Sequence, residues 1–519
     1  EMIVSGNYFQ VQIDFQPFWE KPPLFIWMQV ISMKIFGITA FAARLPNAII
    51  GIFTLCMLYV EGARMRGKQF GRLVAAFFYA TVLPFLYFKS GIIDPSFNFF
   101  IFLGLMQIIR FEAGNLGESG IKGSPWIAGF WIGIATLTKG PVALLVTLLI
   151  YLTYKLIWDR KQFPWLAMFK FTVVFLGVIL TWFGSIVLLT EDGLETIRKF
   201  IVYQTELFSQ PVAGHGQPFF YHPLVFTLGC FPMAAFVYRA MGLRFENGRE
   251  ALLKRFMLVW FWVIMILFSI VRTKIVHYSS LLYYPGAFLA AMYFWELLEG
   301  KKRLHWDNYF LYGLGVLIFG VGVAGVNFLA VHPEWIAPLI QDEFGKAALQ
   351  VNVGWSGWEF VPAGLFMVAM LLNFYFLWQN KYRLWLLIQV IAMPLYINGI
   401  NALVAPRIAD YSQNSAIQFF EEKAGEDAYI MVDGYKSYAH YFYGKIKPFP
   451  HPEIPYADKN AWLARGKVDK RVYLVTRIDK ATEEFENVWF EKFRRLETRG
   501  GFVFYVREPD FAPKSLLDN

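Results

Sequence analysis

Long apolar runs separated by short polar segments make up the chain between residues 41 and 404. About 20 apolar residues are needed for a helix to cross the hydrocarbon core of a bilayer. Runs near or above this length lie at 41–63, 70–88, 92–111, 125–138, 140–158, 168–190, 220–240, 254–271, 275–298, 308–331, 358–379 and 383–404. The pattern predicts an α-helical polytopic membrane protein with about twelve transmembrane helices.

The charges between these runs predict an orientation. Every second segment is basic, and an excess of Lys and Arg is typical of cytoplasmic loops. The basic residues are Arg64, Arg66, Lys68, Arg72, Arg110, Lys122, Lys155, Arg160, Lys161, Lys170, Arg239, Arg244, Arg249, Lys254, Arg255, Lys301, Lys302, Arg303, Lys381 and Arg383. Residues 1–40 and the segment after Ala405 then lie outside the cytoplasm. Since 1–40 holds no span, we expect one more helix ahead of Glu1, which makes thirteen.

Two regions flank the predicted membrane domain, which covers 41–405. Residues 1–40 are predicted to form an extracytoplasmic loop with a juxtamembrane helix, because the apolar stretch 24–37 is too short to span a bilayer. Residues 406–519 are charged and broken by Pro, and we expect a small extracytoplasmic α/β domain with about four strands. Its β-like runs are 429–432, 471–476 and 502–506, and its helical segments are 413–424 and 480–490.

Composition narrows the class of protein. Hydrophobic residues make up 57% of the 519 residues and charged residues 17%, whereas soluble domains carry about 25% charged residues. The net charge of +9 lies in short loops between apolar runs, which argues against a nucleic-acid partner. The only cysteines, Cys56 and Cys230, both lie in apolar runs, so neither a disulfide framework nor a cysteine-based metal site is expected.

Charged residues gather at the predicted outward ends of the spans. They are Glu20, Lys21, Lys89, Asp94, Lys139, Arg272, Lys274 and His277. Each one alone is explained by snorkelling to the interface, and Phe18 and Trp19 beside Glu20 and Lys21 also fit an interfacial anchor. Together, charges at membrane depth are costly and mark function. Their basic excess on one side predicts a pocket for phosphate-bearing lipid headgroups at the outer leaflet.

The longest outward loop of the membrane domain, 191–222, contains His215 and His222 near Pro and aromatic residues. This composition suggests a loop that contacts substrate, or a metal ligand. For one divalent metal ion, Glu20 and His215 are the candidate ligands, with positions left open for a phosphate oxygen. The alternative is that the histidines are ordinary, hydrogen-bonded polar groups.

Five short motifs, in order, carry a resemblance to a known family. They are Glu20-Lys21-Pro22 after an aromatic residue, Ala42-Ala43-Arg44-Leu45-Pro46, Ile93-Asp94-Pro95, Thr138-Lys139-Gly140, and Thr273-Lys274 followed by His277-Tyr278. The pattern resembles the aminoarabinose transferases and the related dolichyl-phosphate-mannose-protein-mannosyltransferase-like enzymes of the GT-C superfamily. It covers the membrane body from residue 1 to about 300, and the C-terminal domain matches only loosely.

The resemblance implies a multi-pass glycosyltransferase of the bacterial cytoplasmic membrane, with an active site that faces the periplasm. Its donor would be a polyprenyl-phosphate-linked hexose or pentose, and its acceptor a lipid A-like lipid or a protein. Lys21 would bind the donor phosphate, and Glu20 and Asp94 would be the catalytic carboxylates. The other implied cavity residues are Arg44, Lys139, His215, Tyr221, Lys274, His277 and Tyr278. The family also carries an acidic motif that would lie ahead of Glu1.

A glycolipid flippase is the alternative from another class of function, because it would use a similar basic and aromatic groove. A flippase is expected to carry polar residues at mid-span, along the path of its cargo. Here the charges lie at the outward ends of the spans, which favours the enzyme. Polyprenyl-phosphate sugar, acceptor and membrane lipids are the predicted partners.

Overall fold

The computed structural model describes residues 1–18, 20–115, 122–159, 163–189, 193–209, 216–245, 248–481 and 492–510. Trp19, Arg160, Lys161 and His215 therefore lie outside the described residues. The chain forms two compact units. The first contains Glu1–Val321 and Leu365–Ile397, and the second contains Gly322–Gly364 and Asn398–Asn519.

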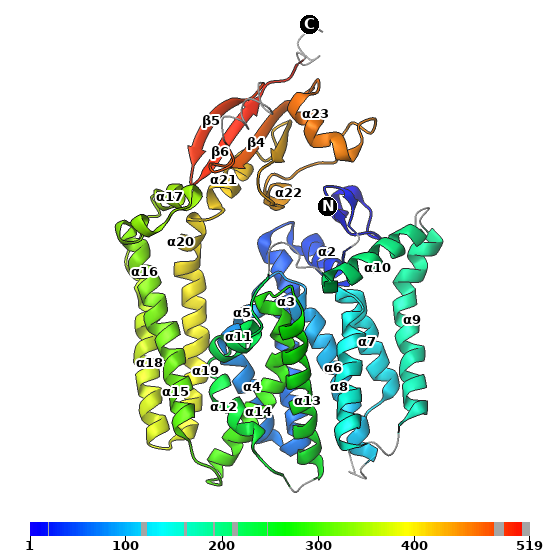
Figure 1. Cartoon of the computed structure of the whole chain (residues 1–519), viewed down its shortest axis with the longest axis vertical. Helices are drawn as coiled ribbons and strands as arrows, with labels where there is room; N and C mark the ends of the chain where they lie inside the picture. The colour runs from blue at the N-terminus through cyan, green and yellow to red at the C-terminus, as the bar shows by residue number, and fades with distance from the viewer. Residues whose placement is uncertain are drawn as a thin grey trace. The chain divides into compact units, whose positions relative to one another are not determined.

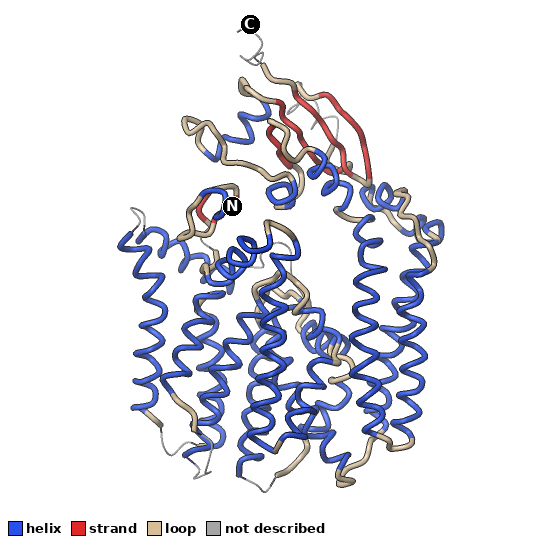
Figure 2. Tube along the Cα trace, turned by 180° about the vertical axis from the view of Figure 1, so that it is seen from behind, coloured by secondary structure: helices blue, strands red, loops and turns tan. Residues whose placement is uncertain are grey.

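The first unit is a helical bundle (Figures 1 and 2). Before the bundle, the chain forms α1 (Met2–Ser5), the short hairpin β1 (Gln12–Ile13) and β2 (Gln16–Pro17), and α2 (Leu24–Phe36). The bundle helices are α3 (Ala40–Arg66), α4 (Lys68–Tyr79), α5 (Val82–Tyr87), α6 (Asp94–Asn115), α7 (Pro125–Lys139), α8 (Val142–Trp158), α9 (Trp165–Leu189), α10 (Gly193–Ser209), α11 (Tyr221–Gly229), α12 (Ala234–Met241), α13 (Gly248–Ile270), the 3₁₀ helix η2 (Val276–Leu282), α14 (Tyr283–Leu298), α15 (Trp306–Val316), most of α18 (Val361–Trp378) and most of α19 (Tyr382–Gly399).

The predicted spans are all helical, but they are not all single helices. Eight helices or joined helices within the described residues are long and apolar enough to cross a membrane, and α11 with α12 makes a ninth if this pair, bent by 115°, is one span. The range 70–88 is interrupted at Ala80 and Thr81, while α7 and α8 have 15 and 17 residues. A multi-pass membrane protein is thus confirmed, and the total of twelve spans stays a prediction.

The ends of the bundle at which the turns lie agree with the predicted alternation of basic and outward-facing loops. α2 and α10 lie at one end of the bundle, and the turn from α14 to α15 lies at the other (Figures 1 and 2). α2 has 13 residues and occupies the stretch predicted to be a short juxtamembrane helix. The basic turns and the charges predicted to face outward are therefore at opposite ends of the same bundle.

The second unit is built around a four-stranded sheet with the order β3-β4-β6-β5. β3 (Ala428–Val432) is parallel to β4 (Arg471–Arg477), and β6 (Phe502–Arg507) is antiparallel to both β4 and β5 (Arg494–Arg499). The predicted runs are β3, β4 and β6. β4 and β6 are buried on both faces, so they read as continuous apolar runs. β5 is an exposed edge strand of charged residues without such a signal.

Short helices complete this unit. They are α16 (Val323–Val331), α17 (Glu343–Leu349), α20 (Ala405–Asp410), α21 (Asn414–Glu422), α22 (Ala439–Tyr443) and α23 (Lys459–Arg465), with short 3₁₀ and π turns between them. α21 matches the predicted helix at 413–424, and most of the one predicted at 480–490 lies outside the described residues. Both apolar clusters of this domain contain residues of β4 and β6.

The segment between α16 and α18 packs against this sheet. The ring of Phe344 in α17 lies edge-on to Phe502 in β6, with the centroids 5.2 Å apart. The Arg477 guanidinium lies 4.5 Å from the centroid of the Phe344 ring. The sheet domain therefore includes a segment well ahead of 406–519, which the sequence pattern did not indicate. The predicted boundaries at 40 and 405, drawn by membrane span, stay a prediction.

Candidate functional site

A cavity of about 100 Å³ lies in the first unit, where α6 begins, α7 ends and α10 passes. Its charged and polar lining residues are Lys21, Asp94, Asn98, Lys139, Gln204, Thr273 and Tyr278. Apolar side chains of α6, α8 and α13, among them Phe97, Val146 and Phe268, form the rest of the wall. The cavity thus combines a few charged groups with an apolar surface, as is typical of ligand sites.

An ion pair between Asp94 and Lys139 lies in the wall of this cavity. Asp94 opens α6 and Lys139 ends α7, so each charge is placed where its helix dipole is favourable to it. The Lys139 Nζ donates a hydrogen bond to Asp94 Oδ1 and lies 5.0 Å from the centroid of the Tyr278 ring. His277 Nε2 lies 3.9 Å from the other Asp94 oxygen. The first turn of η2 thus adds two aromatic groups to the pair.

Asn47 fixes the loop that leads into α6. Its Nδ2 donates to the carbonyl oxygens of Ser90 and Ile92, at 2.9 and 2.6 Å, and its Oδ1 accepts from Ser96 Oγ at 3.0 Å. The Asn47 side chain is fully buried. These three bonds join α3 to both sides of Asp94, so they set the position of the carboxylate.

Replacing Asn47 by alanine should therefore lower stability and activity together. Two carbonyls and one hydroxyl would lose a buried partner, and such groups cost about 1–3 kcal/mol each when unsatisfied. We expect a loss of about 3 kcal/mol, measured as a lower unfolding temperature of the detergent-purified protein. Asn115→Ala, at the exposed last residue of α6, is the matched control and should unfold like the unchanged protein.

Glu20 and Lys21 lie on the loop ahead of α2, and α10 holds them. Tyr203 OH donates to Glu20 Oε2 at 2.7 Å, and Gln204 Nε2 donates to the Glu20 carbonyl oxygen at 3.3 Å. Lys21 Nζ lies 5.3 Å from the centroid of the Tyr203 ring. Burial lowers the pKa of Lys21, the nearby Lys139 cation lowers it further, and the Glu20 and Asp94 carboxylates oppose them. Lys21 is thus a desolvated cation with a second cation beside it.

The other predicted site residues differ in their placement. Lys274 is buried and donates to the carbonyl oxygen of Val271, which lines the cavity, at 2.8 Å. Arg44 is exposed, and its Cγ is near Gly91, where an added Cβ would lie 3.7 Å from it. Tyr221 stands at the start of α11 and is not among the residues that line the cavity. Lys21, Asp94, Lys139 and Tyr278 line one cavity, while Arg44 and Tyr221 do not.

The predicted metal site has only one described ligand. His215 lies outside the described residues, and within the described part of the chain no three His, Cys, Asp or Glu side chains are grouped around one position. Glu20 is engaged by Tyr203, and Asp94 by Lys139. The described residues therefore do not form a metal centre, and the metal stays a prediction. Gly216, next along the chain, pairs with Thr273 at the cavity wall.

Some residues of the cavity escaped the sequence analysis. Gln204 lines the cavity and Tyr203 binds Glu20 beside it, and both belong to α10 in the loop 191–222, where the sequence pattern singled out only the histidines. Asn98 lies one turn after Asp94 and donates to Tyr87 OH and Ser280 Oγ, at 3.2 and 2.7 Å. The four-residue spacing from Asp94 was the available signal for it.

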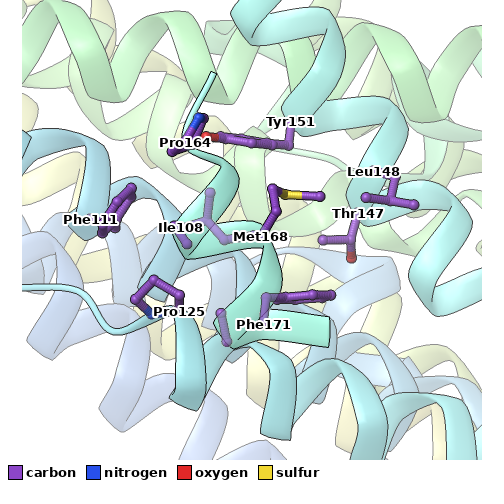
Figure 3. A pocket seen from close by; sticks show the side chains of 11 residues that line it. Ile108, Phe111, Pro125, Thr147, Leu148, Tyr151, Pro164, Met168 and Phe171 are labelled. Atoms are coloured by element: carbon purple, nitrogen blue, oxygen red, sulfur yellow. The ribbon is translucent and has the colours of Figure 1, made fainter. Parts of the chain in front are cut away.

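A second cavity, of about 40 Å³, is lined by apolar side chains of α6 to α9 and by Thr147 and Tyr151 (Figure 3). Its wall includes Ile108, Met168 and Phe171, and it has no charged residue. Tyr151 OH is turned to a carboxylate, donating to Glu112 Oε1 at 2.6 Å. Such a wall suits hydrocarbon and offers nothing to a phosphate or a sugar.

Comparisons with known proteins agree with the motifs. Residues 20–182 match the family model described as dolichyl-phosphate-mannose-protein mannosyltransferase. A relative from Proteus mirabilis, "undecaprenyl phosphate-alpha-4-amino-4-deoxy-L-arabinose arabinosyl transferase 2", is 26% identical over 299 residues, which are 56% of this chain and 53% of that protein. A protein of the same name without the number, from Pseudomonas aeruginosa strain UCBPP-PA14, is 23% identical over 509 residues, 93% of this chain and 88% of that one.

A solved structure shares the fold. The crystal structure of ArnT from Cupriavidus metallidurans bound to undecaprenyl phosphate matches with a TM-score of 0.70 and 16% identity, over 97% of this chain and 91% of that one. The match with the first of the curated relatives spans about half of that relative's length. The predicted GT-C fold is confirmed by this match. Together, these comparisons show that the chain shares the fold of that ArnT structure and that its sequence is similar to aminoarabinose transferases and to the dolichyl-phosphate-mannose-protein mannosyltransferase model.

Proposed function

We propose that this protein transfers a sugar from a polyprenyl-phosphate carrier to a lipid acceptor. The names of the relatives point to undecaprenyl phosphate as the carrier and to 4-amino-4-deoxy-L-arabinose, a pentose, as the sugar. The acceptor that we propose is a lipid A-like molecule. One observation carries the proposal: two ammonium groups, Lys21 and Lys139, line one cavity whose other wall is apolar.

The chemistry follows from this arrangement. An acceptor oxygen attacks the anomeric carbon, the bond from that carbon to the carrier phosphate oxygen breaks, and the bonding electrons leave on the phosphate. The negative charge that develops there is stabilised by cations held in a water-poor site. The Lys139 cation repels the Lys21 cation, so a phosphate between them relieves that repulsion. We assign them to the carrier phosphate.

The carboxylates have separate roles in this proposal. Asp94 is held by Lys139 and borders the cavity, so it orients Lys139 and the acceptor. Glu20 is held by Tyr203 beside Lys21 and completes the donor site. An acceptor phosphate oxygen is already ionised and needs no base, whereas an acceptor hydroxyl does. Since both carboxylates are already engaged, the site suits a phosphate-bearing lipid better than a protein hydroxyl.

The orientation is part of the proposal. The cavity lies at the end of the bundle opposite the basic turns, and basic turns are typical of the cytoplasmic side. The active site then faces the periplasm in a bacterial inner membrane. A lipid-linked donor and a lipid acceptor would both reach it from the outer leaflet of that membrane.

Mass spectrometry tests the proposed reaction directly. The purified protein is incubated with undecaprenyl-phosphate-linked aminoarabinose and lipid A, and the lipids are analysed. We expect lipid A heavier by one aminoarabinose and an equal amount of free undecaprenyl phosphate. A flippase would instead move the intact donor across a vesicle membrane without releasing free carrier, and that outcome would refute the proposal.

Comparing membrane glycolipids with and without the gene identifies the sugar and acceptor in the cell.

The lowered pKa of Lys21 predicts a pH dependence of donor binding. Because the folded protein disfavours its charged form, Lys21 loses its proton at a lower pH than a free lysine does. The KM for the donor should therefore rise as pH increases, starting below pH 10.5. Lys21→Arg keeps its charge throughout this range and should flatten the rise. An identical rise in both proteins would show that another group titrates.

A further inference from the structure

A basic pocket of about 740 Å³ lies at the end of the bundle opposite the catalytic cavity. It is formed by the turn from α14 to α15 and the turn from α18 to α19. The two sites lie at opposite ends of the stretch formed by η2 and α14: Tyr278 and Leu281 at its start border the cavity, and Leu297 at its end borders this pocket. Because the length of α14 separates them, the pocket is a site of its own and not an extension of the cavity.

Four cations line this pocket, namely Lys302, Arg303, Lys381 and Arg383. All four are exposed, and its lining contains no carboxylate among the described residues. By contrast, Arg66 at the same end of the bundle pairs with Glu296 at 2.9 Å. The positive charge of the pocket is thus uncompensated by the side chains that form it.

The backbone of the pocket is held in place. Tyr293 OH donates to the Arg303 carbonyl oxygen at 2.7 Å, which ties the first turn to α14. Tyr382 OH donates to Asn380 Oδ1 at 2.6 Å, and Asn380 itself has a φ of 54°, in the left-handed region. α19 has 18 residues and begins at Tyr382, so the positive end of its dipole adds to the cations.

The walls of the pocket and its surroundings indicate an amphiphilic ligand. Leu298 and Leu384 lie beside the cations, and Leu384 is 44% exposed. Trp306 and Trp378, which flank the two turns in sequence, are 75% and 69% exposed. Tryptophans so placed mark the headgroup level of a bilayer. The cations then sit where the phosphate of a lipid in the same leaflet would lie.

We propose that this pocket binds a phosphate group, and that an anionic phospholipid of the cytoplasmic leaflet supplies it. Arg303 and Arg383 can each hold two phosphate oxygens, and the two lysines add charge. The inference does not depend on the sugar or on the acceptor proposed above. It depends on the basic end of the bundle facing the cytoplasm.

Binding of defined lipids tests the proposal. The full chain, purified in a neutral detergent, is titrated with short-chain phosphatidylglycerol, with phosphatidylcholine and with inorganic phosphate, and bound lipid is counted by native mass spectrometry alongside the unfolding temperature. Phosphatidylglycerol should bind more tightly than phosphatidylcholine and raise the unfolding temperature more. Lys302→Gln/Arg383→Gln should weaken that binding about thirtyfold, since each cation near an anionic lipid contributes about 1 kcal/mol.

A matched variant controls for net charge. Lys68→Gln/Arg72→Gln removes two exposed cations from another basic turn, outside the pocket, and should bind phosphatidylglycerol like the unchanged protein. A cysteine-accessibility assay checks that each variant keeps its orientation. Equal losses in both double variants, or no preference for phosphatidylglycerol, would overturn the proposal. Stabilisation by inorganic phosphate alone, lost only in the pocket variant, would support the phosphate site and identify a soluble source.

Discussion

Replacing Lys21 by alanine should abolish sugar transfer while the protein still inserts into the membrane. Lys21 and Lys139 both line the cavity, but they are held by different partners. The hydrogen bond between Tyr203 and Glu20 fixes the loop that carries Lys21, whereas Asp94 pairs with Lys139. Removing one preorganised group that stabilises developing charge costs about 10²–10³ in rate. We expect at least that loss in kcat/KM for donor, measured with purified protein.

Lys89→Ala is the matched control for this result. Lys89 is another outward-end lysine and stacks on Phe85, 5.4 Å from the ring centroid, but it does not line the cavity. It should keep nearly full transfer. Normal turnover by a well-expressed Lys21→Ala protein would remove Lys21 from the phosphate site and leave the fold assignment untouched.

The pair Asp94 and Lys139 should give the second large effect, and its two members should fail differently. Asp94→Asn keeps the shape of the side chain but loses the charge that orients Lys139, and a misplaced catalytic group costs about 10² in transfer. Lys139→Met leaves a buried carboxylate without its cation, which costs about 3–5 kcal/mol of stability. The double variant should recover stability, because neither charge remains, without recovering transfer.

A second buried pair on α6 provides the comparison. Glu112 accepts from Lys155 at 3.1 Å, far along α6 and α8 from the cavity. Lys155→Met should lower the unfolding temperature as Lys139→Met does, because the buried Glu112 carboxylate would lose the Lys155 cation. Its transfer rate per folded molecule should stay normal. If Lys139→Met also kept its rate per folded molecule, the Asp94–Lys139 pair would be structural only.

Much of this architecture could be predicted because membrane helices follow from apolar run length. Within the described residues the twelve predicted ranges are helical apart from short breaks, and Lys21, Asp94, Lys139 and Tyr278 line one cavity. Run length is a property of each segment alone, so no tertiary information was needed. The alternation of basic loops also predicted that the motif residues lie on the same, outward side of the membrane.

Other features depend on contacts that no single segment encodes. The 115° bend between α11 and α12 and the break between α4 and α5 lie within runs that are apolar throughout. Tyr203 binds Glu20 across 183 positions in the chain, and nothing in its neighbourhood marks it. Arg44 carries a motif of the family, yet its side chain is exposed outside the cavity lining. Its role in binding stays a prediction.

The packing of Phe344 on Phe502 has a practical consequence for anyone who wishes to study the sheet domain alone. A truncation that begins after the last membrane helix would retain β6 but discard one of the two aromatic rings that pack on Phe502, keeping Tyr435 and losing Phe344. Phe502 is only 2% exposed in the intact chain, so the excised fragment would expose more of this apolar side chain to water and tend to aggregate. A soluble version would have to splice the stretch around α17 to the C-terminal segment through a designed linker.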